Sequence, residues 1–256
     1  MEKFAAWSRK ALIILFWLVL WHVLSASIRN QILLVGPLDM LKSLYGLIFV
    51  PGFWQAIGFS FGRICLGFFL AFFLGLGTGA LSFRFPFVGE LLAPPIQFMK
   101  SIPVASFVIL ALIWTGARNL SVFIALIVVY PMIHINTLAG FSSTDKKLLE
   151  MAQIFRVPVW RKGFYLYRIS LYPYLKSACR TALGMAFKSG IAAEVIGVPD
   201  GSIGEGLYLS KIYLSTAELF AWTFVIMIVS TIFEKVFLIL LRLCAGKGVR
   251  EHAAGI

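Results

Sequence analysis

Long uncharged apolar stretches recur along this chain, and they constrain its fold more than any other feature. Residues 11–28 and 64–83 contain no Asp, Glu, Lys or Arg. About 20 consecutive apolar residues make a helix long enough to cross the hydrocarbon layer of a bilayer. The chain is 60% hydrophobic and only 13% charged, far from the composition of a soluble domain. The sequence therefore predicts an all-α polytopic membrane protein.

Breaks in the apolar pattern divide the chain into about six predicted transmembrane helices. We expect these spans at residues 11–28, 56–83, 88–114, 120–138, 173–196 and 219–243. Residues 38–49 form a helix too short to cross, expected at the outer surface. In the third span, Pro94-Pro95 and Ser101-Ile102-Pro103 are expected to break the helix. Residues 197–218 are predicted to be an outer loop with a short re-entrant or interfacial element.

Small and polar residues inside the spans indicate how the helices pack. Small residues let membrane helices approach closely, although glycine is also common in such helices generally; the second span carries Gly67, Gly75, Gly77 and Gly79. His134 is predicted to be a hydrogen-bonded packing residue, because no second ligand stands at metal-binding spacing. Small core positions are also predicted for the cysteines, Cys65, Cys179 and Cys244.

Basic residues are distributed unequally between the two sides of the predicted topology. Thirteen fall in inner loops and tails: Lys3, Arg9, Lys10, Arg84, Lys146, Lys147, Arg156, Arg161, Lys162, Arg168, Arg242, Lys247 and Arg250. Four fall in outer segments: Arg29, Lys42, Arg118 and Lys211. The positive-inside rule then places both termini in the cytoplasm. Because the basic residues cluster at span ends, the net charge of +12 does not indicate a nucleic-acid partner.

The stretch 150–173 interrupts the membrane pattern with polar and basic residues. Apolar residues at helical spacing predict a short amphipathic helix that ends at Pro158; they are Leu148, Leu149, Ala152 and Phe155. A second short amphipathic segment follows, with Trp160 on its apolar side. From the residues alone two interpretations stay open. The helices lie on the lipid surface, or they dock a soluble partner.

The sequence carries no pattern typical of an enzyme. It has no GxxxxGK[ST] phosphate loop and no HExxH, GxSxG or CxxC, so no cofactor is expected on this chain. An ion- or proton-coupled secondary transporter, with Glu194 and Lys188 as its relay, is one alternative. A membrane scaffold is another. The lack of visible inverted repeats argues against the secondary transporter.

The interruption resembles the E-A-A signature of permease subunits of bacterial ATP-binding-cassette (ABC) importers. Glu150-Met151-Ala152 matches it in two of three places, and Trp160 and Pro173 fall where the nitrate/taurine/aliphatic-sulfonate permease family often has Trp and Pro. Arg156 stands where that family has glycine, and Arg168-Ile169 replaces L-P. We therefore expect the turn between the two short helices to be made differently.

Further segments resemble the same family in the same order, over roughly residues 20–245. They are Ser60-Phe61-Gly62-Arg63 with Gly67-Phe68, Ser101-Ile102-Pro103-Val104-Ala105, Trp114-Thr115-Gly116, Pro131 with Asn136-Thr137-Leu138-Ala139-Gly140, Ala192-Ala193-Glu194-Val195-Ile196-Gly197, and Gly204-Glu205-Gly206-Leu207. The resemblance implies an N-terminal span and outer helix at 1–55, a type I ABC-importer transmembrane domain at 56–245 and a cytoplasmic tail at 246–256.

The resemblance also implies partners and a location. It implies a multi-pass protein of the bacterial inner membrane that pairs with a second permease copy. Two cytoplasmic ABC ATPase subunits would hold ATP and magnesium, and an external binding protein would deliver the substrate. That substrate would be a small organic or inorganic anion, such as a sulfonate or nitrate.

Two sets of site residues follow. The ATPase-coupling set is Leu149, Glu150, Ala152, Phe155, Arg156 and Trp160, of which Leu149, Ala152 and Phe155 are expected to fill the partner's groove. The translocation-path set is Arg63, Pro103, Lys188 and Glu194. Arg63, Arg180 and Lys188 would supply positive potential along the path. Alternatively, these three side chains snorkel to the interface or pair with Glu194.

Overall fold

The computed structural model describes residues 2–28, 30 and 32–245, and these contain helices and no strand. The predicted tail, 246–256, lies outside the described residues. In chain order the elements are α1 (Glu2–Ile28), α2 (Pro37–Ile48), α3 (Pro51–Arg84), α4 (Pro86–Ser101), α5 (Val104–Ser142), α6 (Lys146–Ile154), α7 (Val159–Lys162), the π-helix η1 (Gly163–Tyr167), α8 (Arg168–Gly197), α9 (Ile203–Ile212) and α10 (Thr216–Ala245).

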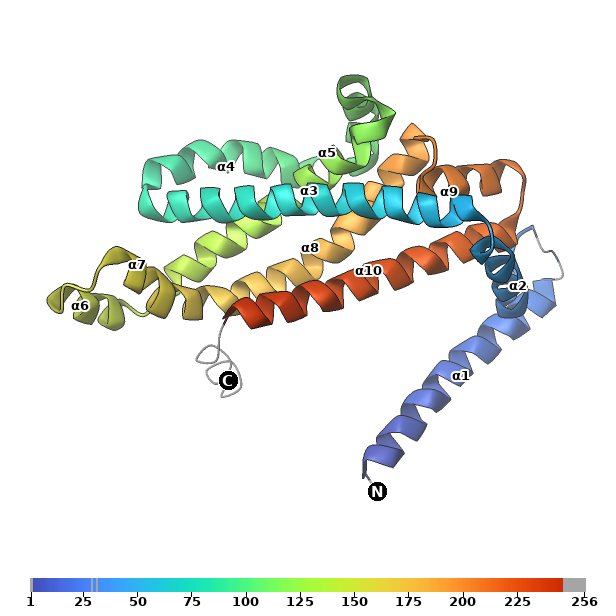
Figure 1. Cartoon of the computed structure of the whole chain (residues 1–256), viewed down its shortest axis with the longest axis horizontal. Helices are drawn as coiled ribbons and strands as arrows, with labels where there is room; N and C mark the ends of the chain where they lie inside the picture. Colours follow the sequence, from blue (N-terminus) through green and yellow to red (C-terminus); the bar gives the residue numbers. More distant parts are fainter. Residues whose placement is uncertain (1, 29, 31, 246–256) are drawn as a thin grey trace.

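The long helices form a bundle with two distinct ends (Figure 1). Helices α3, α8, α10 and the second part of α5 run along the long axis of the molecule. Helices α6 and α7 lie at one end, which we call the α6 end, whereas α2 and α9 lie at the opposite end, the α9 end. The predicted short helix at 38–49 and the predicted short element within 197–218 correspond to α2 and α9.

Four helices of the described chain are long and apolar enough to cross a membrane: Ser8–Ile28, Pro51–Arg84, Val104–Ser142 and Thr216–Cys244. These helices agree with a polytopic membrane protein. Helix α8 is not among the four, and it carries Lys176, Arg180, Lys188 and Glu194. Six crossings and cytoplasmic termini therefore remain predictions.

The predicted third span, 88–114, is not one helix. Helix α4 continues through Pro94 and Pro95 and ends at Ser101, so the expected break at the two prolines is wrong. The fixed φ of proline is compatible with a helix. Proline inside a helix removes one backbone hydrogen bond and crowds the preceding turn, but the helix can continue through it. The break lies at Ile102, which is extended (ψ 128°) because it precedes Pro103. Helix α5 contains the rest of the predicted third span and also the predicted fourth span. The two parts meet at a kink at Gly116 (φ 67°, ψ 164°).

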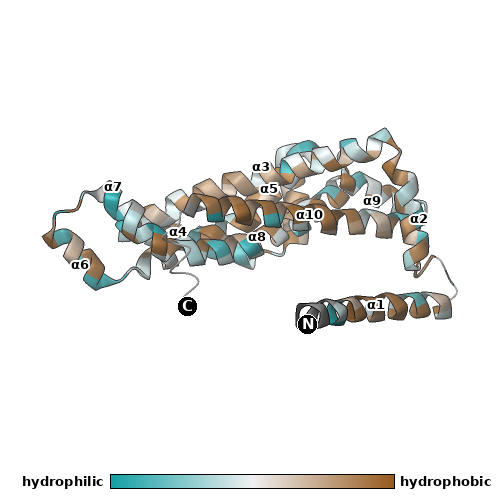
Figure 2. Cartoon of the chain, turned by 60° about the horizontal axis from the view of Figure 1, so that its bottom comes forward, coloured by the Kyte–Doolittle hydropathy of each residue, from teal (hydrophilic) through white to brown (hydrophobic). Residues whose placement is uncertain are grey.

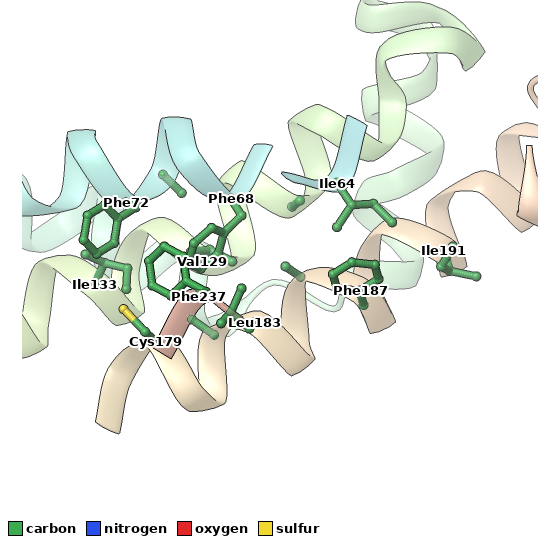
Figure 3. Close-up of a cluster of buried hydrophobic side chains, with 14 of the residues drawn as sticks. Ile64, Phe68, Phe72, Val129, Ile133, Cys179, Leu183, Phe187, Ile191 and Phe237 are labelled. Carbon is green, nitrogen blue, oxygen red and sulfur yellow. The ribbon is translucent and has the colours of Figure 1, made fainter. Parts of the chain in front are cut away.

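A single large apolar cluster fills the space between the long helices (Figure 3). Its residues come from five helices, α3, α5, α8, α9 and α10, and include Ile64, Phe68, Phe72, Val129, Ile133, Cys179, Leu183, Phe187 and Phe237. Cys65 and Cys179 are buried as predicted, whereas Cys244 is exposed. The cluster holds α3, α5, α8 and α10 in fixed positions relative to one another. Functional residues are therefore expected at the ends of these helices.

Three of the four glycines singled out in α3 let it approach α5 closely. A Cβ at Gly75 would lie 2.9 Å from Ile133 Cβ, and one at Gly79 would lie 2.7 Å from Thr137 Cβ. A Cβ at Gly67 would overlap the carbonyl oxygen of Val122. Gly77 faces open space. The packing prediction is therefore confirmed for Gly67, Gly75 and Gly79 and wrong for Gly77.

Helix α1 diverges from the bundle (Figure 2). No residue of its most apolar window is buried, although the window has a mean hydropathy of 2.3. Its far end is tied to the following loop, because Trp21 Nε1 donates to Val35 O at 3.0 Å and Ser25 Oγ donates to Leu34 O at 3.2 Å. Trp21 also packs on Phe220 of α10, with ring centroids 5.8 Å apart. The rest of α1 offers its apolar surface to lipid or to another chain.

Candidate functional site

The predicted amphipathic interruption forms a helical hairpin of α6 and α7 at one end of the molecule (Figure 1). Asp145 caps α6, since its Oδ1 accepts from the backbone N–H of Lys147 at 2.8 Å. Helix α6 ends at Ile154, four residues before Pro158. The predicted amphipathic helix is therefore confirmed, but its predicted end at Pro158 is wrong, because the chain already turns at Arg156. We call residues 146–162 the hairpin.

The hairpin exposes large apolar side chains. Ile154, Phe155 and Trp160 expose 79%, 74% and 68% of their surface. Soluble surfaces seldom present several such residues together without a partner. Ala152 is only 3% exposed, so the prediction that it fills a partner's groove is wrong for this arrangement: its side chain packs inside the chain. Leu149 is half-buried, whereas Glu150 and Arg156 are exposed.

Arg156 makes the turn between α6 and α7 in the left-handed conformation, with φ 49°. Its N–H donates to Gln153 O and the N–H of Val157 donates to Ala152 O, both at 2.9 Å. These two bonds are those of a Schellman cap, in which glycine is usual at the left-handed position. Our expectation of a different turn is therefore wrong. The two capping bonds offset a strain of about 1–2 kcal/mol for a non-glycine residue.

Three aromatic side chains that sequence reasoning missed meet where the hairpin joins the bundle. Phe83 of α3 and Phe141 of α5 stack with centroids 5.4 Å apart. Tyr167 of η1 meets both edge-on, at 5.6 Å and 5.5 Å. No short motif links these residues, because they come from three separate elements. We call Phe83, Phe141 and Tyr167 the aromatic clamp.

At the α9 end, the predicted path residue Glu194 is completely buried. Its Oε2 accepts from Ser60 Oγ at 2.6 Å and from the backbone N–H of Gly204 at 3.4 Å. Ser60 Oγ in turn accepts from the N–H of Ile203 at 2.9 Å. The first N–H groups of α9 have no partner within the helix, and here they are satisfied from α3 and α8. A Cβ at Gly204 would overlap Glu194. Glu194 therefore fixes α9 to the bundle.

Two of the other predicted path residues, Lys188 and Pro103, do not join Glu194 in its buried site. Lys188 is exposed, and six residues along a helix place it on a different side from Glu194. Arg180 Nε pairs with Glu234 Oε1 of α10 at 3.4 Å. The structure thus does not bring together the relay pair that a secondary transporter would use. Pro103 is exposed at the break between α4 and α5.

Arg63 holds the kink of α5 in place. Its Nη1 donates to Asn119 Oδ1 at 2.8 Å and also to the carbonyl oxygen of Arg118. Its guanidinium lies over the ring of Phe59, 4.6 Å from the centroid. The predicted packing role of His134 is confirmed: it is buried, and its Nδ1 lies 2.9 Å from Thr78 Oγ1.

The amino-acid sequence of this chain is similar to those of several transport permeases. No family model matches the chain. It is 29% identical over 163 residues to the bicarbonate transport system permease protein CmpB of Synechocystis sp., covering 63% of this chain and 57% of that protein. It is 28% identical over 201 residues to the nitrate import permease protein NrtB of Synechococcus elongatus, covering 73% and 70%.

A third relative has a different transport substrate in its name. The chain is 24% identical over 222 residues to the taurine transport system permease protein TauC of Escherichia coli, covering 84% of this chain and 80% of that protein. The relatives are transport permeases rather than enzymes. They match the resemblance read from the sequence. The chain is therefore similar to transport permeases whose names specify bicarbonate, nitrate, taurine and, for one named as putative, aliphatic sulfonates.

Proposed function

We propose that this chain is the permease subunit of an ATP-driven importer that moves a small anion received from an external binding protein. The observation that carries the proposal is the exposed hairpin at one end of a bundle of apolar helices, in a chain whose relatives are import permeases. The sequence has no phosphate-binding loop of its own. The energy of ATP must then enter through a partner, and the hairpin is the surface suited to receive it.

The docking surface consists of the exposed side chains of the hairpin. Ile154, Phe155 and Trp160 supply apolar contact area, and buried aromatic anchors often dominate the affinity of an interface. Glu150 and Arg156 supply charges beside them. In this proposal the α6 end is cytoplasmic, in agreement with the excess of basic residues there. The partners are two ABC ATPase subunits, which hold ATP and magnesium.

A second permease copy completes the pathway. Residues 11–28 of α1 carry no charge, yet no residue of the most apolar window of this helix is buried by the rest of the described chain. In the described residues, the space between the long helices of one bundle is occupied by the apolar cluster, which is an unfavourable environment for an anion. A path between two copies of this chain resolves both observations. The chain would cross the inner membrane six times, with α4 and the first part of α5 together making the third crossing.

The substrate follows from the relatives rather than from a pocket in this chain. Their names specify bicarbonate, nitrate, taurine and aliphatic sulfonates, each a small oxyanion or a molecule that carries one. We place a small oxyanion or sulfonate in the same role here. Lys188 is exposed and could face such an anion across the dimer, whereas Arg180 and Arg63 already have partners within the chain.

The proposal is tested with the full chain co-expressed with the ATPase and binding protein of its transport system. Ile154→Asp puts a charge into the apolar docking surface without touching the core. We expect at least about a tenfold loss of ATPase co-purification, since a hot-spot residue commonly contributes 2 kcal/mol or more. Uptake of labelled nitrate, bicarbonate or taurine into proteoliposomes should fall with it.

A matched control is Tyr213→Ser at the opposite end, where the side chain is 74% exposed. This variant should retain the ATPase. Unchanged co-purification and uptake in Ile154→Asp would overturn the proposed function. Uptake of none of the three anions, together with uptake of a cation, would overturn the substrate class.

A further inference from the structure

The aromatic clamp joins three elements at the base of the hairpin. Phe83 is the penultimate residue of α3, Phe141 is the penultimate residue of α5, and Tyr167 is the last residue of η1. The chain enters the hairpin at Lys146, five residues after Phe141, and leaves it at Lys162, five residues before Tyr167. The clamp therefore closes the base of the hairpin and binds it to α3, a helix that is separate from the hairpin in sequence.

The backbone that leads to Tyr167 has an unusual conformation. Residues 163–167 form a π-helix, and the N–H of Arg168 donates to Gly163 O, five residues earlier. Such turns are rare, because their wider ring of hydrogen bonds is less favourable than that of an α-helix, and they are frequent at functional sites. The π-helical turn connects α7 directly to α8 and carries Tyr167, whose ring contacts both Phe83 and Phe141 edge-on.

The contact between α5 and α8 next to the clamp leaves little room for movement. A Cβ at Gly140 would lie 2.8 Å from Leu171 Cδ1 and 3.1 Å from Leu171 Cα. These two helices are thus in close contact immediately beside the hairpin. Ring contacts are less directional than hydrogen bonds, and aromatic pairs occupy both stacked and edge-on arrangements. The α3 end can therefore shift against η1 more readily than α5 can shift against α8.

We propose that the aromatic clamp is the joint that transmits movement of the hairpin to the end of α3, and that Tyr167 is its positioning residue. This inference rests on the proposed function, since it assumes that an ATPase moves the hairpin. When the hairpin tilts, the Tyr167 ring pushes against Phe83, and α3 follows. Without the ring, the ATPase still docks, but its movement reaches α3 only weakly.

The test measures ATP hydrolysis and anion uptake together, in proteoliposomes that contain the whole complex. In Tyr167→Ala we expect normal co-purification of the ATPase but about a tenfold fall in anion taken up per ATP hydrolysed, within the range of coupling between two sites. Tyr167→Phe keeps the ring and should restore the wild-type ratio. Phe87→Ala, which removes a 74% exposed ring near the same end, should leave the ratio unchanged.

The outcomes separate this inference from the proposed function. A wild-type ratio in Tyr167→Ala overturns the joint, and so does a Tyr167→Phe variant as uncoupled as Tyr167→Ala. If Tyr167→Ala does not assemble, Phe83→Leu, which keeps the apolar volume without a ring, replaces it and is read in the same way. Failure of the proposed function has a different signature, because Ile154→Asp would then leave the ATPase bound.

Discussion

The two ends of the bundle are held together by different chemistry. At the α9 end, the buried Glu194 joins α3, α8 and α9 through hydrogen bonds of 2.6 Å and 3.4 Å. At the α6 end, the aromatic clamp joins α3, α5 and η1 through ring contacts of 5.4–5.6 Å. Hydrogen bonds weaken steeply with angle and distance, whereas rings keep contact while they slide. The comparison indicates a fixed α9 end and an adaptable α6 end.

Hydrogen bonds at the α9 end and ring contacts at the α6 end should also contribute differently to the free energy of unfolding. A buried polar group that loses its partner costs about 1–3 kcal/mol, because it has already given up water. An aromatic pair contributes about 0.5–1.5 kcal/mol beyond the area that it buries. Damage at Glu194 should therefore reduce stability strongly, whereas damage at the clamp should reduce coupling more than stability.

The largest expected effect is that of Glu194→Ala. The substitution leaves Ser60 and the N–H of Gly204 without their acceptor and opens a cavity in a closed site, so we expect a loss of about 3–5 kcal/mol in the free energy of unfolding. Thermal unfolding of the purified permease, followed by circular dichroism, measures it. Protease cleavage within 198–202 should rise as α9 detaches.

The matched control keeps the shape and the acceptor oxygen. Glu194→Gln should lose about 1 kcal/mol or less, because the amide oxygen can still accept from Ser60 and from Gly204. Equal losses in Glu194→Ala and Glu194→Gln would show that charge rather than hydrogen bonding holds the α9 end. Hydrogen bonding would then not explain the difference between the α9 end and the α6 end.

An intermediate effect on stability is expected for Phe141→Ala at the α6 end. Phe141 is half-buried, so the lost area and the two lost ring pairs should reduce the free energy of unfolding by about 2 kcal/mol. The same unfolding experiment measures this. A loss as large as that of Glu194→Ala would contradict the proposal that the α6 end is the adaptable one.

Sequence reasoning was successful where a pattern repeats along one helix. Apolar runs predicted the long helices, and the amphipathic spacing predicted α6. It was less successful where two physical rules compete. Proline can end a helix or sit inside it, which is why the break was placed at Pro94-Pro95 as well as at Pro103. The identity of Arg156 argued against a left-handed turn that the capping hydrogen bonds in fact support.

The remaining features depend on contacts between distant segments. A carboxyl group inside a membrane helix indicates function, and Glu194 was singled out for that reason. Its partner Ser60 lies in another helix, however, so the anchoring of α9 could not be read from the sequence. The aromatic clamp had still less signal, because the π-helical turn that positions Tyr167 has no sequence signature in this chain.

The smallest expected effect distinguishes the backbone of the hairpin from its side chains. Arg156→Gly relieves the strain of the left-handed turn, about 1–2 kcal/mol, but adds freedom to the unfolded chain, worth about 0.4–1 kcal/mol. The net gain should be about 0.5–1 kcal/mol. Hydrogen exchange of the backbone N–H of Val157, which closes the cap, measures the local gain.

Arg156→Ala completes this experiment because it removes the guanidinium and keeps the strain. If the exposed Arg156 side chain contacts the ATPase, both variants should bind it several-fold more weakly, and only Arg156→Gly should exchange more slowly. If both variants instead bind the ATPase as well as wild type does, the Arg156 side chain makes no contact with it. The hairpin would then dock through its apolar face alone, and the adaptable α6 end would need a rigid turn beside it, because a loose cap would absorb the movement before it reached Tyr167.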